Sequence, residues 1–581
     1  MTSNATVPLY SSRLKERLAK LYQPHDTDFL TEAIEHEIET FAAGYLQQER
    51  GRLWDQSDVM LITYGDSIRT GDTLPLETLR AFLEQRLRGV VNIVHLLPFF
   101  PFSSDDGFAV IDYLQVNPRL GGWEHIEELN QSFDLMFDLV INHVSSQHEW
   151  FRQFIADQQP GRGYFITPPE TAALDQVVRP RESPLLTPVN TAGGMRRVWT
   201  TFSADQVDMD FSNPLVLLEY VRILLAYLNR GARFIRLDAI AFLWKEWGTN
   251  CMNLPQTHEA VRLLRDLASA AVPETVLLTE TNVPHQQNIS YFGDSDEAHM
   301  IYQFSLAPLL LHALYRGTGT YLTDWARICC NTPPGCTFLN FTASHDGVGM
   351  RPLEGLLPQG EVLLLLRGME KFGGRISYRR NSDGSKTPYE INISYFDALK
   401  GTWLTEDSWQ IARFLLAQTL MLGLRGVPAL YIHSLLATPN DHAGVERTGR
   451  ARMINRHRWD LENLEELLSD RQSNQSLVFN ELCRRIRIRR HQPAFHPDAR
   501  QEILFLGEHL FGFWRYSLDG SQRILAVHNL TDQLRNLYLD GALDGQLPGR
   551  WTGLLTGEEV TGSQGLIKLP PYHVLWLTPA D

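Results

Sequence analysis

The sequence of 581 residues has few cysteines and no long apolar run. Its five cysteines cannot all pair, and they lack the dense, even spacing of a disulfide-rich secreted domain, so a reducing compartment is expected. The longest apolar stretches, such as FSLAPLLLHAL at residues 304–314, are far shorter than the roughly 18 to 20 residues that cross a bilayer. The first 22 residues contain no apolar core with a cleavage site. We therefore predict no signal peptide and no membrane helix, and we expect a cytoplasmic protein.

Positive charge is also in deficit. The chain carries 53 Lys and Arg against 68 Asp and Glu, a formal charge of -15. A surface of that sign repels polyanions, so nucleic acid and acidic membranes are excluded as default partners. With 43% apolar and 21% charged residues, the composition is typical of an ordered globular chain large enough for more than one domain.

Eight short apolar runs, rich in β-branched and aromatic residues, alternate with helix-like segments. Near-continuous apolar strands separated by helices predict a closed parallel sheet, a (β/α)8 TIM barrel of the α/β class, with its chemistry at the C-terminal ends of the strands. The runs are 59–66, 91–100, 135–143, 232–239, 276–282, 300–305, 337–346 and 427–433.

The remaining segments have other patterns. Residues 11–50 show helical spacing, two gaps are too long for a single crossover helix, and short alternating strands follow residue 500. Insertions at the catalytic face of a barrel usually build the walls of the site. We therefore predict an N-terminal helical extension at 1–57, barrel segments at 58–144, 216–346 and 411–499, insertions at 145–215 and 347–410, and a C-terminal antiparallel β domain at 500–581.

Three predicted strands end in a carboxylate: Asp238 after GARFIRL, Glu280 after VLLT, and Asp346 in SHD. A fourth ends at His143, in INH. A carboxylate at a strand end is more often a cap or an ion-pair partner than a catalyst. Three of them on three strands of one barrel, however, predict a shared catalytic site.

Here the sequence resembles a known family. DLVINH, RFIRLDA, LLTE and SHD are similar to the four signature stretches of the α-amylase family, glycoside hydrolase family 13. KEWGTNCMNLPQTH, FSLAPLLLHAL and RMINRH resemble the sucrose phosphorylase branch of that family. The resemblance runs from about residue 59 to about residue 460.

This resemblance implies Asp238 as nucleophile, Glu280 as general acid and base, and Asp346 as the carboxylate that stabilises the transition state. Cleavage of an α-glucosidic bond with retention requires an attacking carboxylate and a neutral acid about 5 to 5.5 Å apart. Arg236 lies two residues before Asp238, on the same side of its strand, and is expected to keep Asp238 ionised. Desolvation and neighbouring carboxylates are expected to raise the pKa of Glu280.

Binding of the glucosyl ring follows from the same resemblance, which places Asp105 and Arg452 on the ring hydroxyls. The motif SSDDGF leaves open whether Asp105 or Asp106 has this role. Three further residues are implied to contact the ring: His143 and His345 by hydrogen bonds, and Phe108 by stacking. For the histidines, the alternative is a buried ring satisfied by the backbone.

For the acceptor side, Arg181 in RPRESP matches the segment that contacts phosphate in the branch, and Tyr389 matches the tyrosine of its mobile loop. The planar guanidinium suits phosphate oxygens, although an exposed loop arginine is the alternative. Two positions depart from the sucrose pattern: Arg351 in VGMRPLEG, and Glu390 where sucrose enzymes tend to carry Gln. Glucosylglycerate phosphorylases resemble the chain better here, and Arg351 is expected to pair with the glycerate carboxylate.

The predicted function is therefore a retaining α-glucoside phosphorylase that uses inorganic phosphate as co-substrate and forms a covalent glucosyl-aspartate intermediate. Glucosylglycerate is favoured over sucrose as substrate, with an α-glucosidase, a transglucosylase or a non-enzymatic subunit as further alternatives. No cofactor and no metal are expected, because no Cys or His pair has zinc spacing and Asn142 has no obvious acidic partner for calcium. The expected assembly is a monomer or homodimer.

Overall fold

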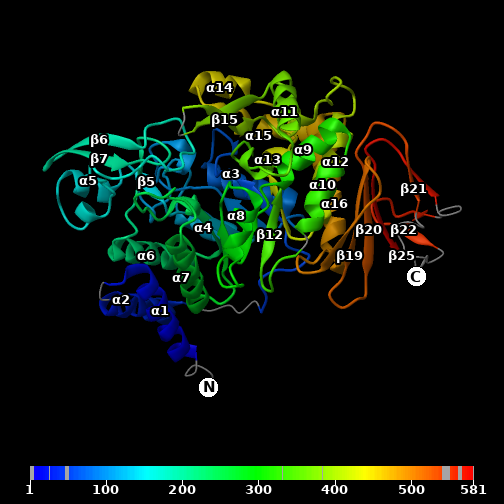
Figure 1. Ribbon diagram of the computed structural model, residues 1–581. Helices are drawn as coiled ribbons and strands as arrows, with labels where there is room; N and C mark the ends of the chain where they lie inside the picture. Colours follow the sequence, from blue (N-terminus) through cyan, green and yellow to red (C-terminus); the bar gives the residue numbers. More distant parts are fainter. Residues whose placement is uncertain are drawn as a thin grey trace.

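The structure is a computed structural model that describes residues 6–24, 27–45, 51–329, 331–381, 384–538, 550–560 and 566–579. Its centre is a closed barrel of eight parallel strands, in the order β1-β16-β12-β11-β10-β9-β4-β3 (Figure 1). Each of the eight predicted runs coincides with one of these strands, with β4 beginning one residue before its run, so the predicted TIM barrel is confirmed. The strands are β1 (Met60–Thr63), β3 (Ile93–Leu96), β4 (Asp134–Val140), β9 (Ala232–Asp238), β10 (Val276–Thr279), β11 (Met300–Tyr302), β12 (Thr337–Phe341) and β16 (Val427–Tyr431).

Helices cover the outside of the barrel, which is why its strands are buried on both faces. α6 shows how the sequence sets a helix start: the Asn213 side chain accepts a hydrogen bond from the Leu215 amide at 3.0 Å, and Pro214 occupies the first turn. The covering helices include α3 (Pro75–Leu87), α4 (Trp123–Asn130), α6 (Pro214–Asn229), α7 (Pro255–Ala271), α9 (Leu306–Arg316), α10 (Thr320–Ile328), α12 (Gln410–Gly423), α15 (Leu461–Ser469) and α16 (Asn474–Arg490).

The N-terminal segment forms two helices, α1 (Thr6–Tyr22) and α2 (Asp28–Gly44), which pack on α7 and α6 (Figure 1). The apolar faces of the pair are buried, and Arg17 donates hydrogen bonds of 3.0 Å to Glu259 and to Asp266 on α7. The extension is therefore attached to the barrel through both apolar packing and ion pairs.

The two long insertions carry elements of their own. The first contains α5 (Glu149–Ile155), the hairpin β6 (Leu186–Thr191) and β7 (Gly194–Trp199), and β8 (Gln206–Asp208), which pairs with β5 (His143–Ser145) next to the barrel. The second contains β13 (Val348–Gly349), α11 (Gln359–Lys371) and the hairpin β14 (Arg375–Arg380) and β15 (Lys386–Asn392). The domain boundaries given above stay a proposal.

The C-terminal region is an antiparallel six-stranded sheet in the order β18-β19-β20-β25-β22-β23, as predicted from its alternating pattern. Phe513 and Trp576 of this sheet approach Gly423 at the end of α12, and the sheet shares the main apolar core with the barrel. In the residues that the structure describes, no helix has the length and apolarity to cross a membrane. The sheet strands are β18 (Arg500–Leu504), β19 (Leu510–Tyr516), β20 (Arg523–Asn529), β22 (Trp551–Gly553), β23 (Glu559–Val560) and β25 (Val574–Pro579).

Candidate active site

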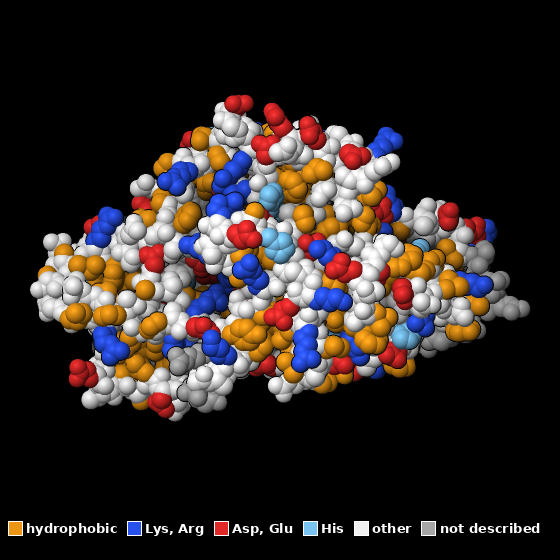
Figure 2. Space-filling model, turned by 90° about the horizontal axis from the view of Figure 1, so that it is seen from above, with side chains coloured by type: hydrophobic (Ala, Val, Ile, Leu, Met, Phe, Trp, Pro, Cys, Tyr) orange, Lys and Arg blue, Asp and Glu red, His pale blue; other side chains and the backbone are white. Residues whose placement is uncertain are grey.

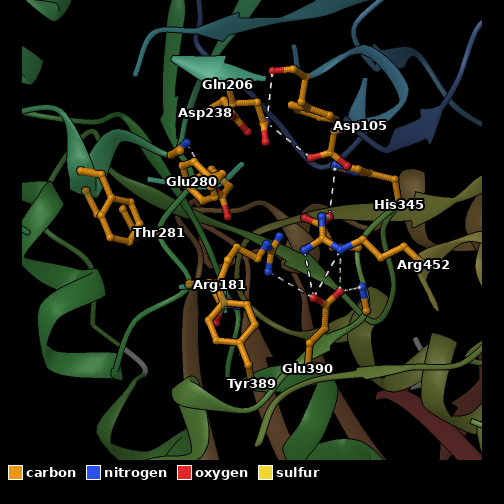
Figure 3. Close-up of a pocket in the computed structure, with 18 of the residues that line it drawn as sticks. Asp105, Arg181, Gln206, Asp238, Glu280, Thr281, His345, Tyr389, Glu390 and Arg452 are labelled. Atoms are coloured by element: carbon orange, nitrogen blue, oxygen red, sulfur yellow. Dashed lines mark hydrogen bonds and ion pairs between the residues drawn. The ribbon is translucent and has the colours of Figure 1, made fainter. Parts of the chain in front are cut away.

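A pocket lies at the C-terminal ends of the barrel strands, where the sequence placed the chemistry (Figure 3). Asp238 ends β9, Glu280 follows β10 directly, and Asp346 follows β12 after a short turn. Eleven of the thirteen predicted site residues line this pocket, and Arg236 and Arg351 do not. The eleven are Asp105, Phe108, His143, Arg181, Asp238, Glu280, His345, Asp346, Tyr389, Glu390 and Arg452.

Asp238 and Glu280 share a single buried cation. Arg236 Nη1 donates a 2.7 Å hydrogen bond to Asp238 Oδ1, and Arg236 Nη2 lies 4.0 Å from Glu280 Oε2. Burial raises the pKa of both carboxyls, and Arg236 opposes this shift. The expectation that Arg236 simply keeps Asp238 ionised was therefore incomplete, because desolvation outweighs the cation. We infer that the pair retains one proton, and the closer contact with Arg236 favours the negative charge on Asp238.

Behind Arg236 lies a second buried carboxylate that the sequence analysis missed. Asp138, on the neighbouring strand β4, accepts a hydrogen bond from Arg236 Nη1 and contacts His95 Nε2 at 2.7 Å. Burial acts to raise the pKa of Asp138, but Arg236 and His95 outweigh this effect and lower the pKa to about 2. Asp138 therefore stays ionised and holds the guanidinium beneath Asp238. Its signal was its position within DLVINH, two residues from the end of the strand.

The opposite wall of the pocket is an ion network. Arg452 makes a bidentate pair with Glu390, at 3.0 Å from Nε and 2.9 Å from Nη2, and its Nη1 lies 2.5 Å from Asp346 Oδ1. Although burial opposes the shift, Arg452 and other cations nearby lower the pKa of Asp346 well below its usual range. Asp346 is therefore ionised beside the pair that shares a proton.

Both predicted histidines are buried and uncharged at neutral pH. Burial lowers the pKa of His345 to about 3 and also lowers the pKa of His143. His143 Nε2 lies 2.9 Å from the Phe108 carbonyl oxygen, so the backbone does occupy this nitrogen. Phe108 stacks on His345 with ring centroids 4.8 Å apart, which covers one face of the phenyl ring.

The structure separates the two adjacent aspartates of SSDDGF. Asp105 lines the pocket, whereas Asp106 pairs with Arg456 at 2.7 Å. The loop takes a left-handed path, and Gly107 has φ +116. A Cβ there would lie 2.6 Å from the Pro98 carbonyl oxygen, so only glycine fits.

Arg181 lines the same pocket as Asp238 and Glu280, and Figure 3 shows it next to Tyr389 and Glu390. Its guanidinium carbon is 5.4 Å from the centroid of Tyr389 and 6.0 Å from that of Phe202, and its Nη1 is 4.0 Å from Glu390 Oε2. The side chain therefore lies close to two aromatic rings, and its ion pair with Glu390 is a long one. A guanidinium held in this way can donate hydrogen bonds to an oxyanion.

Arg351 does not reach the pocket wall. Its Nη1 contacts Met252 Sδ at 3.6 Å, and its Nε lies 3.8 Å from Glu354. This geometry does not support pairing with an acceptor carboxylate. It matches an internal ion pair within the segment that follows Asp346.

The structure corrects the expectation that Asn142 has no acidic partner. Asp208, on β8 of the first insertion, accepts a 3.0 Å hydrogen bond from Asn142 Nδ2. Lys245 Nζ lies 2.7 Å from Asp208 Oδ2 and 2.8 Å from Asn142 Oδ1. The Lys245 ammonium group occupies the position between these oxygens where a calcium ion would bind, so a calcium ion does not fit here.

The sequence analysis also missed several pocket residues. Thr281 and Asn282 directly follow Glu280, so the rule that strand ends carry chemistry could have found them. Gln206 and Phe202 come from the first insertion, and no sequence signal marked them. Further lining residues are Ala239, Ala241, Phe242, Val283, Phe304 and Gly347.

Comparisons with known proteins agree with this architecture. The family model "Alpha amylase, catalytic domain" matches residues 88–322. The glucosylglycerate phosphorylase of Escherichia coli (strain K12) is 42% identical over 535 residues, covering 92% of this chain and 94% of that enzyme. The sucrose phosphorylase of Agrobacterium vitis is 31% identical over 468 residues, covering 76% and 89%. The crystal structure of sucrose 6F-phosphate phosphorylase from Thermoanaerobacter thermosaccharolyticum superposes with a TM-score of 0.71 at 26% identity, covering 84% of this chain and 94% of that one.

Proposed function

This chain belongs to the α-amylase family, together with the glucosylglycerate phosphorylases, and we propose that it is a retaining phosphorylase of 2-O-α-glucosylglycerate. The observation that carries the proposal is that Asp238 and Glu280, both bordering the buried Arg236, line a single pocket together with Arg181. The pair is suited to break a glucosidic bond, and the arginine is suited to bring an anion to the intermediate.

In the first step, a carboxylate oxygen of Asp238 attacks C1 of the glucosyl ring while the bond from C1 to the glycerate oxygen breaks. Glu280 gives its proton to that oxygen, so that glycerate leaves as an alcohol. The ionised Asp346 stabilises the positive charge that develops on the ring. Ring hydroxyls are bound by Asp105 and Arg452.

In the second step, a phosphate oxygen attacks C1 from the side that glycerate left, and the ester bond to Asp238 breaks. Glu280 takes the phosphate proton, and α-glucose 1-phosphate is released. Arg181 offers the fixed cation that favours phosphate over water at this stage. Tyr389 and Glu390 complete the acceptor side in this proposal.

Sucrose is the second candidate substrate. The higher identity to the glucosylglycerate enzyme, 42% against 31% for the sucrose enzyme, over a larger share of the chain, favours glycerate. The buried position of Arg351 weakens the residue-level argument for glycerate but does not favour fructose.

The direct test is release of glucose 1-phosphate from glucosylglycerate and from sucrose in phosphate buffer. We expect release from glucosylglycerate to be at least tenfold faster, and Asp238→Asn should lose several orders of magnitude of rate with both. Faster release from sucrose would refute the substrate proposal. Formation of free glucose alone would refute phosphorolysis.

The role of Arg181 has its own test. Arg181→Ala should lower the ratio of glucose 1-phosphate to free glucose, because only one of the two acceptors is an anion. Arg197→Ala is the matched control, since Arg197 is an exposed arginine of β7 in the same insertion. An unchanged product ratio in Arg181→Ala would exclude Arg181 as a phosphate ligand.

A further inference from the structure

A second cavity, of about 620 Å³, adjoins the active-site pocket. The two share one wall, which includes Arg181, Glu390 and Arg452. The outer wall of this second cavity, here called the outer cavity, is formed by the hairpin β14–β15 and by residues 450–456. Figure 2 looks onto the upper face of the molecule and shows several Lys and Arg side chains near its middle.

The residues that line the outer cavity carry more positive than negative charge, whereas the whole chain is acidic. Five cationic side chains line it, against the three carboxylates Asp105, Glu182 and Glu390. The chain as a whole carries -15, so an anion is repelled by the average surface and attracted to this cavity. The five cations are Arg181, Lys386, Arg450, Arg452 and Arg456.

Three of these cations keep hydrogen-bonding capacity. Arg450 is 50% exposed, and its nearest carboxylate oxygen, on Asp106, is 3.8 Å away, beyond hydrogen-bond distance. Lys386 is 60% exposed and pairs with Glu182 at 2.7 Å, which leaves two of its three donors. Arg456 is buried, and its Nη2 makes no hydrogen bond within the described residues, although it lies 3.6 Å from Asp346 Oδ1.

We propose that the outer cavity binds the oxyanion group of the substrates, with Lys386 and Arg450 as the residues that hold it next to Arg181. This inference rests on the proposed function, in which both substrates and both products carry a phosphate or a carboxylate group. Only the wall shared by the two cavities separates a phosphate or carboxylate bound there from Asp238 and Glu280. The site thus offsets the repulsion that the acidic surface imposes on such substrates.

The test compares Lys386→Gln/Arg450→Gln with Arg500→Gln/Lys568→Gln, a control that removes one exposed arginine and one exposed lysine from the C-terminal region. At low ionic strength, the KM for phosphate should rise roughly five- to tenfold in the first variant only, with kcat within about twofold. The difference should shrink at about 0.5 M NaCl, where the screening length is only about 4 Å. The proposal would be overturned if the KM values for phosphate and for glucosylglycerate were both the same in the two variants.

Two further measurements identify the ligand. The KM for glucosylglycerate at saturating phosphate reports on the carboxylate, and a neutral aryl glucoside is the uncharged reference. A rise for phosphate only, for glucosylglycerate only or for both assigns the site to that oxyanion, and an equal rise for the neutral glucoside refutes it. Titration calorimetry with inorganic phosphate and with glycerate tests the site without turnover, and dissociation constants equal to those of the control for both ions contradict it. If the wild type released no glucose 1-phosphate, the proposed function would fail while this binding result still decided the site.

Discussion

At the scale of single residues, the catalytic pocket is organised by one buried cation between carboxylates. Arg236 contacts Asp138 below and Asp238 above, and Glu280 lies 4.0 Å away. Burial raises the pKa of Asp238 and of Glu280, whereas Asp138 stays ionised. The position of the shared proton therefore depends on charges on three neighbouring strands.

The pH profile of the first chemical step should follow this shared proton. The wild type should lose kcat/KM on glucosylglycerate at alkaline pH, where the pair loses its remaining proton. Glu280→Gln has no second carboxyl to titrate, so its kcat/KM on α-glucosyl fluoride, which needs no proton donor, should have no alkaline limb. An alkaline limb of unchanged midpoint in Glu280→Gln would place the proton elsewhere.

Asp138→Asn should shift the alkaline limb to lower pH, because the Asp138 charge helps to raise the pKa of Asp238. It should also lower kcat by about 10²-fold, since the guanidinium loses one of its anchors. Asp134→Asn is the control, on the same strand but paired with Arg233. It should lower stability without moving the pH profile. If both variants left the limb in place, Asp138 would have only a structural role.

Arg351→Ala should lower the rates of glucosyl transfer to glycerate, glycerol and fructose to a similar extent. The reason is that Arg351 contacts Glu354 and Met252 and does not line the pocket. Transfer rates from glucose 1-phosphate to these three acceptors measure the effect. A loss confined to glycerate, of about 1.5 to 3 kcal/mol, would instead show that the side chain pairs with the carboxylate during turnover.

At the scale of secondary-structure elements, one lysine joins the first insertion to the barrel. Lys245 follows β9 and pairs with Asp208 of β8, and both side chains are almost completely buried. Since β8 also carries Gln206 into the pocket, this contact helps to shape the wall of the active site.

Lys245→Met should lower the free energy of unfolding by roughly 3 to 5 kcal/mol, because it leaves the Asp208 charge buried without its cation. Urea denaturation and limited proteolysis of residues 145–215 measure the loss. Asp208→Asn in the Lys245→Met background should recover part of it, since the uncompensated charge is then removed. Lys20→Met, which breaks an exposed pair with Glu16, should cost less than about 1 kcal/mol. A similarly small cost for Lys245→Met would contradict the argument.

At the scale of the whole molecule, the C-terminal sheet shares part of its apolar residues with the core of the barrel and has a second apolar cluster of its own. Arg515 on β19 is fully buried and donates hydrogen bonds to the Gly423 carbonyl oxygen at 2.9 Å and to the His496 carbonyl oxygen at 2.6 Å. It thereby links the sheet to the end of α12. The two parts are expected to unfold together.

Calorimetry should therefore show a single unfolding transition for the wild type. Arg515→Met should lower the free energy of unfolding by roughly 2 to 4 kcal/mol, because buried carbonyl groups lose charged donors. Arg523→Met is the control, since Arg523 lies over Trp514 at 5.7 Å and should cost about 1 kcal/mol. Separate transitions in the wild type would disprove the shared core.

Local sequence patterns were enough for the barrel and for the carboxylates at its rim, whereas most other pocket residues were predicted from the resemblance to the α-amylase family. A strand buried on both faces must be apolar along its length, so the eight runs were visible without coordinates. Asp238, Glu280 and Asp346 were found because parallel strands of a barrel bring their C-terminal ends to one rim.

Only the tertiary structure decided what depends on distant contacts. The pairing of Asp106 with Arg456, the burial of Arg351 and the pairing of Lys245 with Asp208 are set by partners that lie far away in the chain. The same holds for the shared proton, because desolvation is a property of the folded surroundings and not of the strand that carries Asp238. Sequence by itself determined which groups meet at the rim, and the fold determined their charges and their partners.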